Sequence, residues 1–262
     1  MRRRFFVECF NGGSAVLRGE AAHHLGRVLR AEPGQLYELS DGESAWLARA
    51  ECVRRDAVEF TLVERLAVTP ARLCVTLMIA VVKFERFEWA IEKATELGVD
   101  EIVPLAAERS EKGLIAASVK RAERWEKILT ESAQQSRRLK VPILRDTAEP
   151  KAAFRSTQAQ IRVLLSERSG ATPMREVLET ADMTFRDSEK LSVAMAIGPE
   201  GGWTAPEFSA ALDSGFAEAA LGNNILRTET AVCAGLAAIQ YAFGTGRHEH
   251  FGKSAEIKGE NA

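Results

Sequence analysis

The sequence predicts an α/β protein in two parts, a small strand-rich module followed by a mostly parallel sheet that helices cover on both faces. The first observation is that apolar runs up to about position 70 are short and separated by turn signals. The second is that longer apolar runs beyond that point alternate with segments of helical periodicity, which is typical of parallel sheets. We therefore expect one domain over residues 1–70, a second over 71–250, and a frayed tail over 251–262.

Short strands are the expected elements of the first module. The runs that are apolar or that alternate in polarity are Phe5–Val7, Gln35–Leu39, Ala45–Ala50 and Ala57–Leu62. The turn signals between them are Asn11–Gly13, Pro33-Gly34 and Asp41-Gly42. One helical segment, Ala21–Arg30, interrupts the strands, because Ala22, Leu25, Val28 and Leu29 fall on one face. Together these elements predict a small β-barrel-like module.

Buried strands and amphipathic helices are expected to alternate in the second part. The expected strands are Leu73–Val82, Val99–Leu105, Ile161–Leu165, Leu191–Ile197 and Ala219–Leu221. The expected helices are Phe84–Leu97, Ser118–Arg138, one that begins within Thr172–Leu178, and Thr228–Phe243. Thr204 and Glu207 have the spacing of a capping box, which predicts a further helix start.

Composition indicates a soluble globular protein that is expected in the cytoplasm. The 262 residues carry a net charge of -2 and are 46% hydrophobic, which excludes a polycation and provides for a sizeable core. The four cysteines are far apart, so neither a disulfide framework nor a zinc site is expected. His248 and His250 lack a third ligand, and we expect no metal. The longest apolar run, around Leu73–Val82, is about half the length that spans a bilayer.

Two glycine-bearing bends carry the strongest functional signal. The strand Leu191–Ile197 stops at Gly198–Gly202, and the short strand Ala219–Leu221 stops at Gly222. Glycine tolerates positive φ and lets a ligand approach the backbone closely. Since the carboxyl ends of neighbouring parallel strands form the usual ligand crevice of α/β sheets, the two bends predict a shared pocket. The first bend lacks the spacing of a P-loop and of a dinucleotide-binding turn.

Taken together with other segments, these bends resemble one known family. GPEGG at Gly198–Gly202 and LGNNILRTETA at Leu221–Ala231 are similar to the paired signature of the RsmE family, the 16S rRNA (uracil-N3)-methyltransferases of the SPOUT superfamily. Further similar pieces occur in the same order along the chain. They are RRFFV at Arg3–Val7, HHLGRVLR at His23–Arg30, RFEWAIEKATELGVDEIVPL at Arg86–Leu105 and QQSRR at Gln134–Arg138. The resemblance therefore covers nearly the whole chain.

The resemblance implies a fold and a cofactor. The second domain would contain a C-terminal deep trefoil knot, the first would be a PUA-like RNA-binding barrel, and two knot domains would form a homodimer. Three knot loops would bind S-adenosyl-L-methionine. Carried over by position, the cofactor-binding residues are Leu165, Ser166, Glu167, Ile197, Gly198, Pro199, Glu200, Gly201, Gly202, Leu221, Gly222, Ile225, Leu226, Arg227, Thr228 and Thr230.

The implied reaction is methylation of N3 of a specific uridine in 16S rRNA within the small ribosomal subunit. Because N3 is a weak acid, a base must remove its proton or a cation must stabilise the resulting anion. The candidates are Arg227, which we favour, and Glu229, with Glu200 as a further carboxylate. The expected RNA-binding residues are Arg2, Arg3, Arg4, His23, His24, Arg27, Arg30, Arg109, Arg137 and Arg138.

Two departures from the family pattern affect RNA contact more than cofactor binding. Asn223-Asn224 stands where the family commonly has Pro-Arg, and Glu131–Ala133 precedes the Gln-Gln pair where Ala-x-Glu-Gln is usual. Two alternatives stay open on the sequence. One is a knotted methyltransferase with a different RNA target atom, and the other is a non-catalytic RNA-binding protein of the same fold.

Overall fold

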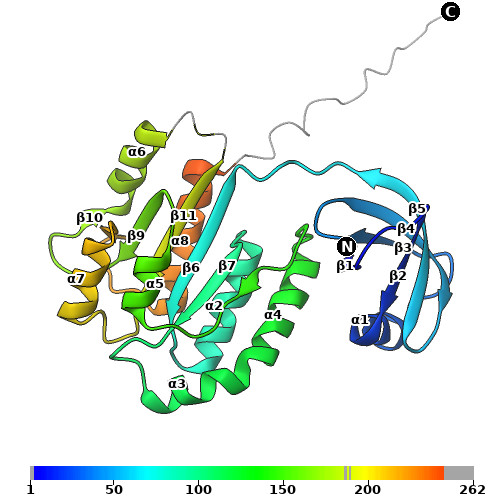
Figure 1. Cartoon of the computed structure of the whole chain (residues 1–262), viewed down its shortest axis with the longest axis horizontal. Coiled ribbons are helices and arrows are strands. Elements are labelled where there is room, and N and C mark those ends of the chain that lie inside the picture. Colours follow the sequence, from blue (N-terminus) through cyan, green and yellow to red (C-terminus); the bar gives the residue numbers. More distant parts are fainter. Residues whose placement is uncertain (1–2, 186–187, 189, 245–262) are drawn as a thin grey trace, which may run out of the picture.

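The computed structural model describes residues 3–185, 188 and 190–244. It contains a small N-terminal sheet and a larger sheet with helices on both faces, joined by an extended segment (Figure 1). The tail expected over 251–262 lies outside the described residues, as do His248 and His250. Within those residues, no helix is both long enough and apolar enough to cross a membrane.

The N-terminal sheet is curled and mixed, with five strands among the described residues in the order β1-β3-β4-β5-β2. The strands are β1 (Arg4–Phe6), β2 (Ser14–Arg18), β3 (Leu36–Ser40), β4 (Ala45–Val53) and β5 (Ala57–Leu66). Strand β1 runs parallel to β3, and the other pairs are antiparallel. Strand β2 was not predicted, because only Ala15 and Leu17 mark its buried face. The expected helix begins earlier, as α1 (Gly19–His23), and continues as the π-helical turn η1 (His24–Val28).

The larger sheet is parallel throughout the described chain and has the order β10-β12-β9-β11-β6-β7-β8. Its strands are β6 (Leu73–Ala80), β7 (Glu101–Leu105), β8 (Ile143–Leu144), β9 (Ile161–Leu165), β10 (Thr172–Pro173), β11 (Leu191–Ile197) and β12 (Ala217–Ala220). The parallel α/β sheet predicted from the sequence is therefore confirmed. The short strands β8 and β10 are too brief to give a periodic signal and were not predicted.

Helices cover both faces of this sheet. Helices α2 (Phe84–Glu96), α4 (Ala122–Gln135), α6 (Met174–Phe185) and α8 (Thr228–Phe243) pack on one face. Helices α5 (Pro150–Ser156) and α7 (Ala205–Asp213) pack on the other. The single helix predicted over Ser118–Arg138 is wrong: the chain forms α3 (Lys112–Ser118), a 3-10 turn η2 (Val119–Arg121) and then α4.

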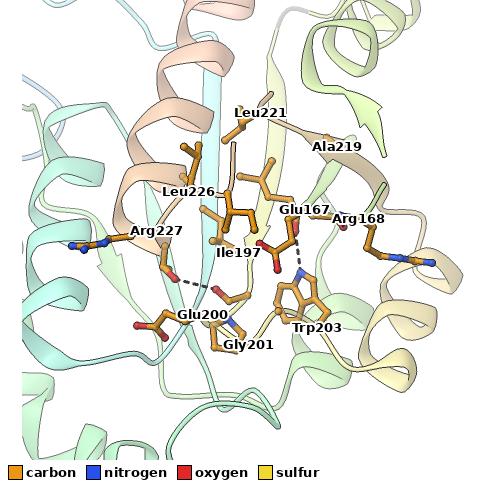
Figure 2. Close-up of a pocket in the computed structure, with 18 of the residues that line it drawn as sticks. Glu167, Arg168, Ile197, Glu200, Gly201, Trp203, Ala219, Leu221, Leu226 and Arg227 are labelled. Carbon is orange, nitrogen blue, oxygen red and sulfur yellow. Dashed lines mark hydrogen bonds between the residues drawn. The ribbon is translucent and has the colours of Figure 1, made fainter. Parts of the chain in front are cut away.

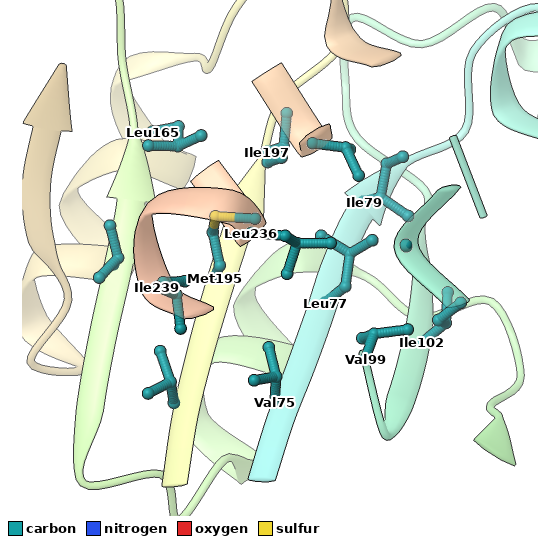
Figure 3. Close-up of a cluster of buried hydrophobic side chains, with 14 of the residues drawn as sticks. Val75, Leu77, Ile79, Val99, Ile102, Leu165, Met195, Ile197, Leu236 and Ile239 are labelled. Carbon is teal, nitrogen blue, oxygen red and sulfur yellow. The ribbon is translucent and has the colours of Figure 1, made fainter. Parts of the chain in front are cut away.

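Alternate residues of the central strand β11 pack into the two cores that lie on opposite faces of the larger sheet. Val193, Met195 and Ile197 belong to the core beneath α8, whereas Ala194 and Ala196 belong to the core beneath α7. Figure 3 shows Met195 and Ile197 beside Leu236 and Ile239 of α8. Successive strand residues face opposite sides of a sheet, so an uninterrupted apolar run is needed where both sides are covered.

A nearly buried carboxylate joins the two sheets. Glu38 on β3 is 8% exposed and accepts hydrogen bonds from Arg4 of its own module at 3.3 and 3.0 Å. Arg137, just after α4, forms a second ion pair with Glu38 at 3.5 Å, and its carbonyl accepts a hydrogen bond from Arg4 at 2.8 Å. The Ser40 hydroxyl donates to the Leu139 carbonyl at 2.6 Å. These contacts fix the N-terminal sheet beside the end of α4 (Figure 1).

Candidate functional site

A cavity of about 400 Å³ opens at the carboxyl ends of β9, β11 and β12, and we refer to it as the strand-end cavity. Three loops border it: the segment after β9, the glycine turn after β11, and the segment between β12 and α8 (Figure 2). The two glycine-bearing bends thus do share one pocket, as the sequence predicted. Its lining residues are Arg109, Leu165–Arg168, Ile197–Trp203, Phe208, Ala219, Leu221–Thr228 and Ala231.

Trp203 connects the first two loops. Its indole N–H donates a hydrogen bond to the Leu165 carbonyl at 3.1 Å (Figure 2), and its ring lies against Gly198. A Cβ at position 198 would lie 3.1 Å from that ring, closer than most real Cβ contacts, so glycine lets the tryptophan pack this tightly. Gly198 also lines the strand-end cavity, so its expected role of letting a cofactor approach the backbone stays a prediction.

Arg109 reaches the cavity from the loop between β7 and α3. Its guanidinium donates to the Gly201 carbonyl at 2.6 Å, and a Cβ at position 201 would lie 3.3 Å from the stem of Arg109. The glycine at 201 thus makes room for an arginine of the protein. Gly222 differs, because its φ of +135° strains any other residue and no atom lies within 4 Å of a Cβ built there. Of the three glycines singled out, only Gly222 faces open space.

Glu207 fixes the loop that carries Arg109. This carboxylate is 5% exposed and accepts from the backbone N–H and hydroxyl of Thr204, both at 2.9 Å, so the predicted capping box is present. Its other oxygen accepts from the backbone N–H of Glu108 at 2.8 Å. The start of α7 and the Arg109 loop are therefore held together by one buried carboxylate.

The third loop places apolar side chains at the cavity. Ile225 is 80% exposed and Leu226 is 36% exposed, although both are large and apolar. The hydroxyl of Thr228, at the start of α8, donates to the Gly198 carbonyl at 3.3 Å and so links this loop to the glycine turn. An exposed apolar pair that borders a hollow provides a surface for a flat ring.

The charged groups around the cavity differ in how firmly they are held. Arg86 on α2 binds Glu200 at 2.9 Å and lies 3.9 Å from Glu229, whose second oxygen is buried without a hydrogen bond. Arg168 packs over the Phe208 ring at 4.1 Å. Arg227 is exposed, its guanidinium points away from the cavity centre in Figure 2, and no ion pair or hydrogen bond of its side chain occurs among the described residues.

Of the residues predicted to bind the cofactor or to act in catalysis, all but Thr230 and Glu229 line this cavity. Thr230 is exposed beyond the rim, and Glu229 faces Arg86 behind it. The lining residues that sequence reasoning did not assign to the pocket are Arg109, Arg168, Trp203, Phe208, Ala219, Asn223, Asn224 and Ala231. Of these, Trp203 could have been predicted most easily, because it directly follows the glycine turn.

Some of the residues predicted to bind RNA are exposed to solvent, whereas others form contacts within the protein. Arg3, Arg27 and Arg30 are exposed, whereas His23 and His24 are half-buried. Arg2 lies outside the described residues. Arg4 and Arg137 are both engaged by Glu38, and Arg109 belongs to the strand-end cavity.

Arg138 requires a correction. It binds Asp100 at 3.1 Å and the Thr95 carbonyl at 3.0 Å, with only 13% of its side chain exposed. Burial lowers the pKa of this guanidinium, and the Asp100 carboxylate opposes that shift. Arg138 therefore serves the interior rather than an RNA-facing surface. Among the residues described, no group of histidine, cysteine and carboxylate side chains has the arrangement of a metal site.

Comparison with known proteins identifies the family. A family model described as an RNA methyltransferase domain matches residues 69–240. Ribosomal RNA small subunit methyltransferase E of Mycobacterium bovis is 32% identical over 243 residues, 90% of each chain. That of Synechocystis is 33% identical over 225 residues, 83% of this chain and 69% of the relative.

Solved structures agree over the whole fold. The Neisseria gonorrhoeae ribosomal RNA small subunit methyltransferase E, bound to S-adenosyl methionine, superposes with a TM-score of 0.79 at 26% identity, covering 93% of this chain and 98% of its own. A Legionella pneumophila protein in complex with the same cofactor gives a TM-score of 0.78 at 29% identity, covering 92% and 98%. The chain belongs to the ribosomal RNA small subunit methyltransferase E family.

Proposed function

We propose that this protein transfers a methyl group from S-adenosylmethionine to N3 of a uridine in the 16S rRNA of the small ribosomal subunit. The observation that carries the proposal is the meeting of three loops in one strand-end cavity, in a chain of this family. The relatives act by name on small-subunit rRNA, and two similar structures hold S-adenosylmethionine. The choice of N3 follows from the sequence resemblance.

The residues of the cavity fit this cofactor. Its volume, about 400 Å³, lies within the range of pockets for small ligands. Ile225 and Leu226 offer apolar surface to an adenine ring. Glu167 points into the cavity and suits a positively charged ammonium or sulfonium group, while Arg109 suits a carboxylate (Figure 2). Gly222 leaves its backbone open to close approach by a ligand.

The protein has to orient the uracil and stabilise charge. When bound, S-adenosylmethionine supplies a methyl group on a cationic sulfur, which keeps the electron pair of the breaking S–CH3 bond. The N3 proton passes to water at the open rim, and the N3 electron pair forms the new N–CH3 bond. Holding the two reacting groups in line contributes up to about 7–11 kcal/mol to such reactions.

Arg227 is the best candidate to stabilise the uracil anion. Its side chain is exposed at the rim and free among the described residues, so it can turn toward a bound base. The carboxylates of Glu200 and Glu229 both pair with Arg86. Neither is therefore placed to accept the N3 proton. We therefore assign Glu229 a positioning role through Arg86, in place of the catalytic role expected from the sequence.

Finer features of the fold belong to the same proposal. The curled N-terminal sheet is proposed to be a PUA-like RNA-binding domain, with Arg3, Arg27 and Arg30 exposed to contact phosphates. The three loops at one strand end are proposed to form a trefoil knot. Helices α2 and α8 contact each other and expose Trp89 (45%) and Tyr241 (93%), which supports a homodimer through this face.

Mass spectrometry of rRNA nucleosides tests the proposed function. In a strain that lacks the protein, 3-methyluridine should disappear from 16S rRNA, and the wild-type chain should restore it. Arg227→Ala should restore little of it while S-adenosylmethionine binding, measured by calorimetry, stays near wild type. Unchanged 3-methyluridine with loss of another methylated nucleoside would indicate a different target atom. No change in any nucleoside, with no cofactor binding, would indicate a non-catalytic RNA-binding protein.

A further inference from the structure

A second hollow of about 400 Å³ lies in the N-terminal module, and we refer to it as the N-terminal hollow. Its lining comes from two segments, the π-helical turn η1 with the end of α1, and the turn between β4 and β5. The lining residues are His23, Gly26, Arg27, Val53, Arg54 and Arg55. Four of these six are basic in type, and none is acidic. Arg54 and Arg55 were not among the residues that the sequence pointed to.

The backbone brings the two walls together by specific contacts. In η1 the Leu29 N–H donates to the His24 carbonyl at 3.1 Å, a spacing of five residues that widens the helical turn. A Cβ at Gly26 would lie 3.2 Å from Val53 Cγ1, so glycine allows this turn to approach the β4–β5 turn closely. The Gly19 N–H donates to the Asp56 carbonyl at 3.1 Å and fixes the same approach from the start of α1.

Three acidic residues, Glu20, Asp56 and Glu59, lie near the hollow, but none of them lines it. Glu20 on α1 is engaged by Lys127 from α4, and this pairing lowers the pKa of Glu20. Glu59 binds Arg54 at 3.3 Å, but both side chains are well exposed, at 43% and 63%. An exposed pair of this kind is worth roughly 0–1 kcal/mol and exchanges readily for a stronger anion. Arg27 and Arg55 are exposed toward solvent.

We propose that the N-terminal hollow binds a phosphate group of the rRNA backbone. Arginine forks match phosphate oxygens with paired hydrogen bonds, and here arginines from two segments converge on one hollow. Four of the six lining residues are basic in type, which favours an anion over an uncharged base. The inference rests on the proposed function and adds to it the place where the N-terminal module holds its RNA. Phosphate contacts fix register, so the hollow sets the docking of the subunit rather than the choice of uridine.

A pair of matched double variants tests the assignment. Arg54→Ala/Arg55→Ala removes two arginines of the hollow, and Arg49→Ala/Arg65→Ala removes two exposed arginines of the same sheet that do not line it. The probe is the purified small subunit from a strain lacking the protein, titrated in 50–200 mM salt, a range over which phosphate contacts weaken steeply. Steady-state methylation of the same subunits gives KM and kcat.

The hollow variant is expected to raise KM for the subunit about tenfold, with kcat and cofactor affinity unchanged. It should also reduce the slope of log affinity against log salt by about 1 per phosphate lost. The matched control should remain within about twofold of wild type. Equal losses in both variants would show an effect of net charge alone and overturn the assignment, as would no loss in either.

Two further outcomes separate the sources of failure. If Arg54→Ala/Arg55→Ala weakens binding of inorganic phosphate but leaves KM for the subunit unchanged, the hollow is a small-anion site and the RNA assignment is wrong. If the wild-type protein itself neither binds nor methylates the subunit, the proposed function fails, and the RNA assignment fails with it. A wild-type enzyme that methylates the subunit, with an unaffected hollow variant, contradicts the RNA assignment alone.

Discussion

The strand-end cavity and the N-terminal hollow have similar volumes but are built from different parts of the chain. The cavity is formed by loop backbone at the ends of β9, β11 and β12, and its charged side chains include both signs. The hollow is formed by basic side chains around a widened helical turn. A ligand of the cavity is therefore selected mainly by shape, and a ligand of the hollow mainly by charge. Salt should weaken binding at the hollow far more than at the cavity.

The two regions also differ in how they are supported. The cavity lies at the ends of central strands in a sheet that is buried on both faces. The loops that border it therefore start from tightly packed strand ends. The hollow depends on a short helical turn packed against one hairpin, and the module that carries it is fixed to the larger domain through Glu38. Changes at Glu38, at the glycine turn and at Trp203 should therefore have separable effects.

The largest expected effect is on stability, from Glu38→Ala. Removing this carboxylate leaves Arg4, which is 13% exposed, and Arg137 without the anion that they share. Breaking a buried ion pair costs about 3–5 kcal/mol. We expect urea denaturation to show a loss of that size. Cofactor affinity should change little, because Glu38 lies outside the strand-end cavity.

Glu59→Ala provides the control for this change, since its pair with Arg54 is exposed. It should cost less than about 1 kcal/mol. If Glu38→Ala were no more destabilising than Glu59→Ala, the contact between the two modules would not contribute to folding.

The next largest effect is expected from Gly198→Val at the strand-end cavity. A side chain here meets the Trp203 ring at 3.1 Å, and that ring is held between Phe154 and the Leu165 carbonyl. Displacing it distorts two of the three loops, so S-adenosylmethionine affinity should fall about 100-fold, which corresponds to about 2.7 kcal/mol. Isothermal calorimetry measures the loss. Gly113→Val, where a Cβ meets nothing within 4 Å, should bind normally.

Sequence reasoning predicted long elements well and spatial neighbours poorly. The bounds of β9, β11 and α8 agree with the predictions, because long apolar runs and a sustained helical period are strong signals. The strand β8 and helix α5 were missed, since short segments carry too few periodic positions.

The cavity shows where such reasoning stops. Glycine at positions 198 and 201 signalled a close approach, but the sequence could not show that Trp203 and Arg109 make it. Arg109 is 92 residues from Gly201 along the chain, and only the parallel packing of β7, β6 and β11 brings them together. Arg54 and Arg55 likewise meet Arg27 only because β4 and β5 return to α1.

A moderate effect is expected from Trp203→Phe. This change keeps an aromatic ring against Gly198 and removes the indole N–H that donates to Leu165. The loss of one hydrogen bond of this kind costs about 1 kcal/mol, so cofactor affinity should fall about fivefold. Trp89→Phe, on the exposed side of α2, should leave the affinity unchanged. Equal affinities for both variants would show that the link between the first two loops is not needed for binding.

The smallest expected effect concerns the reactivity of the cysteine thiols, and it involves no change in stability or activity. Cys9 in the N-terminal module is exposed, whereas Cys74 on β6 and Cys233 on α8 are half-buried. Burial raises the pKa of both the Cys74 and the Cys233 thiol. A raised pKa means that less thiolate is present at pH 8, and the thiolate is the reactive form. A thiol reagent should therefore label Cys9 first, and labelling of Cys74 and Cys233 should keep accelerating as the pH rises above 8.

Peptide mass spectrometry after short exposures measures the order of labelling, and in urea the differences between the cysteines should largely vanish. Labelling of Cys233 as fast as Cys9 in the folded protein would mean that α8, and with it one wall of the strand-end cavity, opens to solvent far more often than its packing indicates.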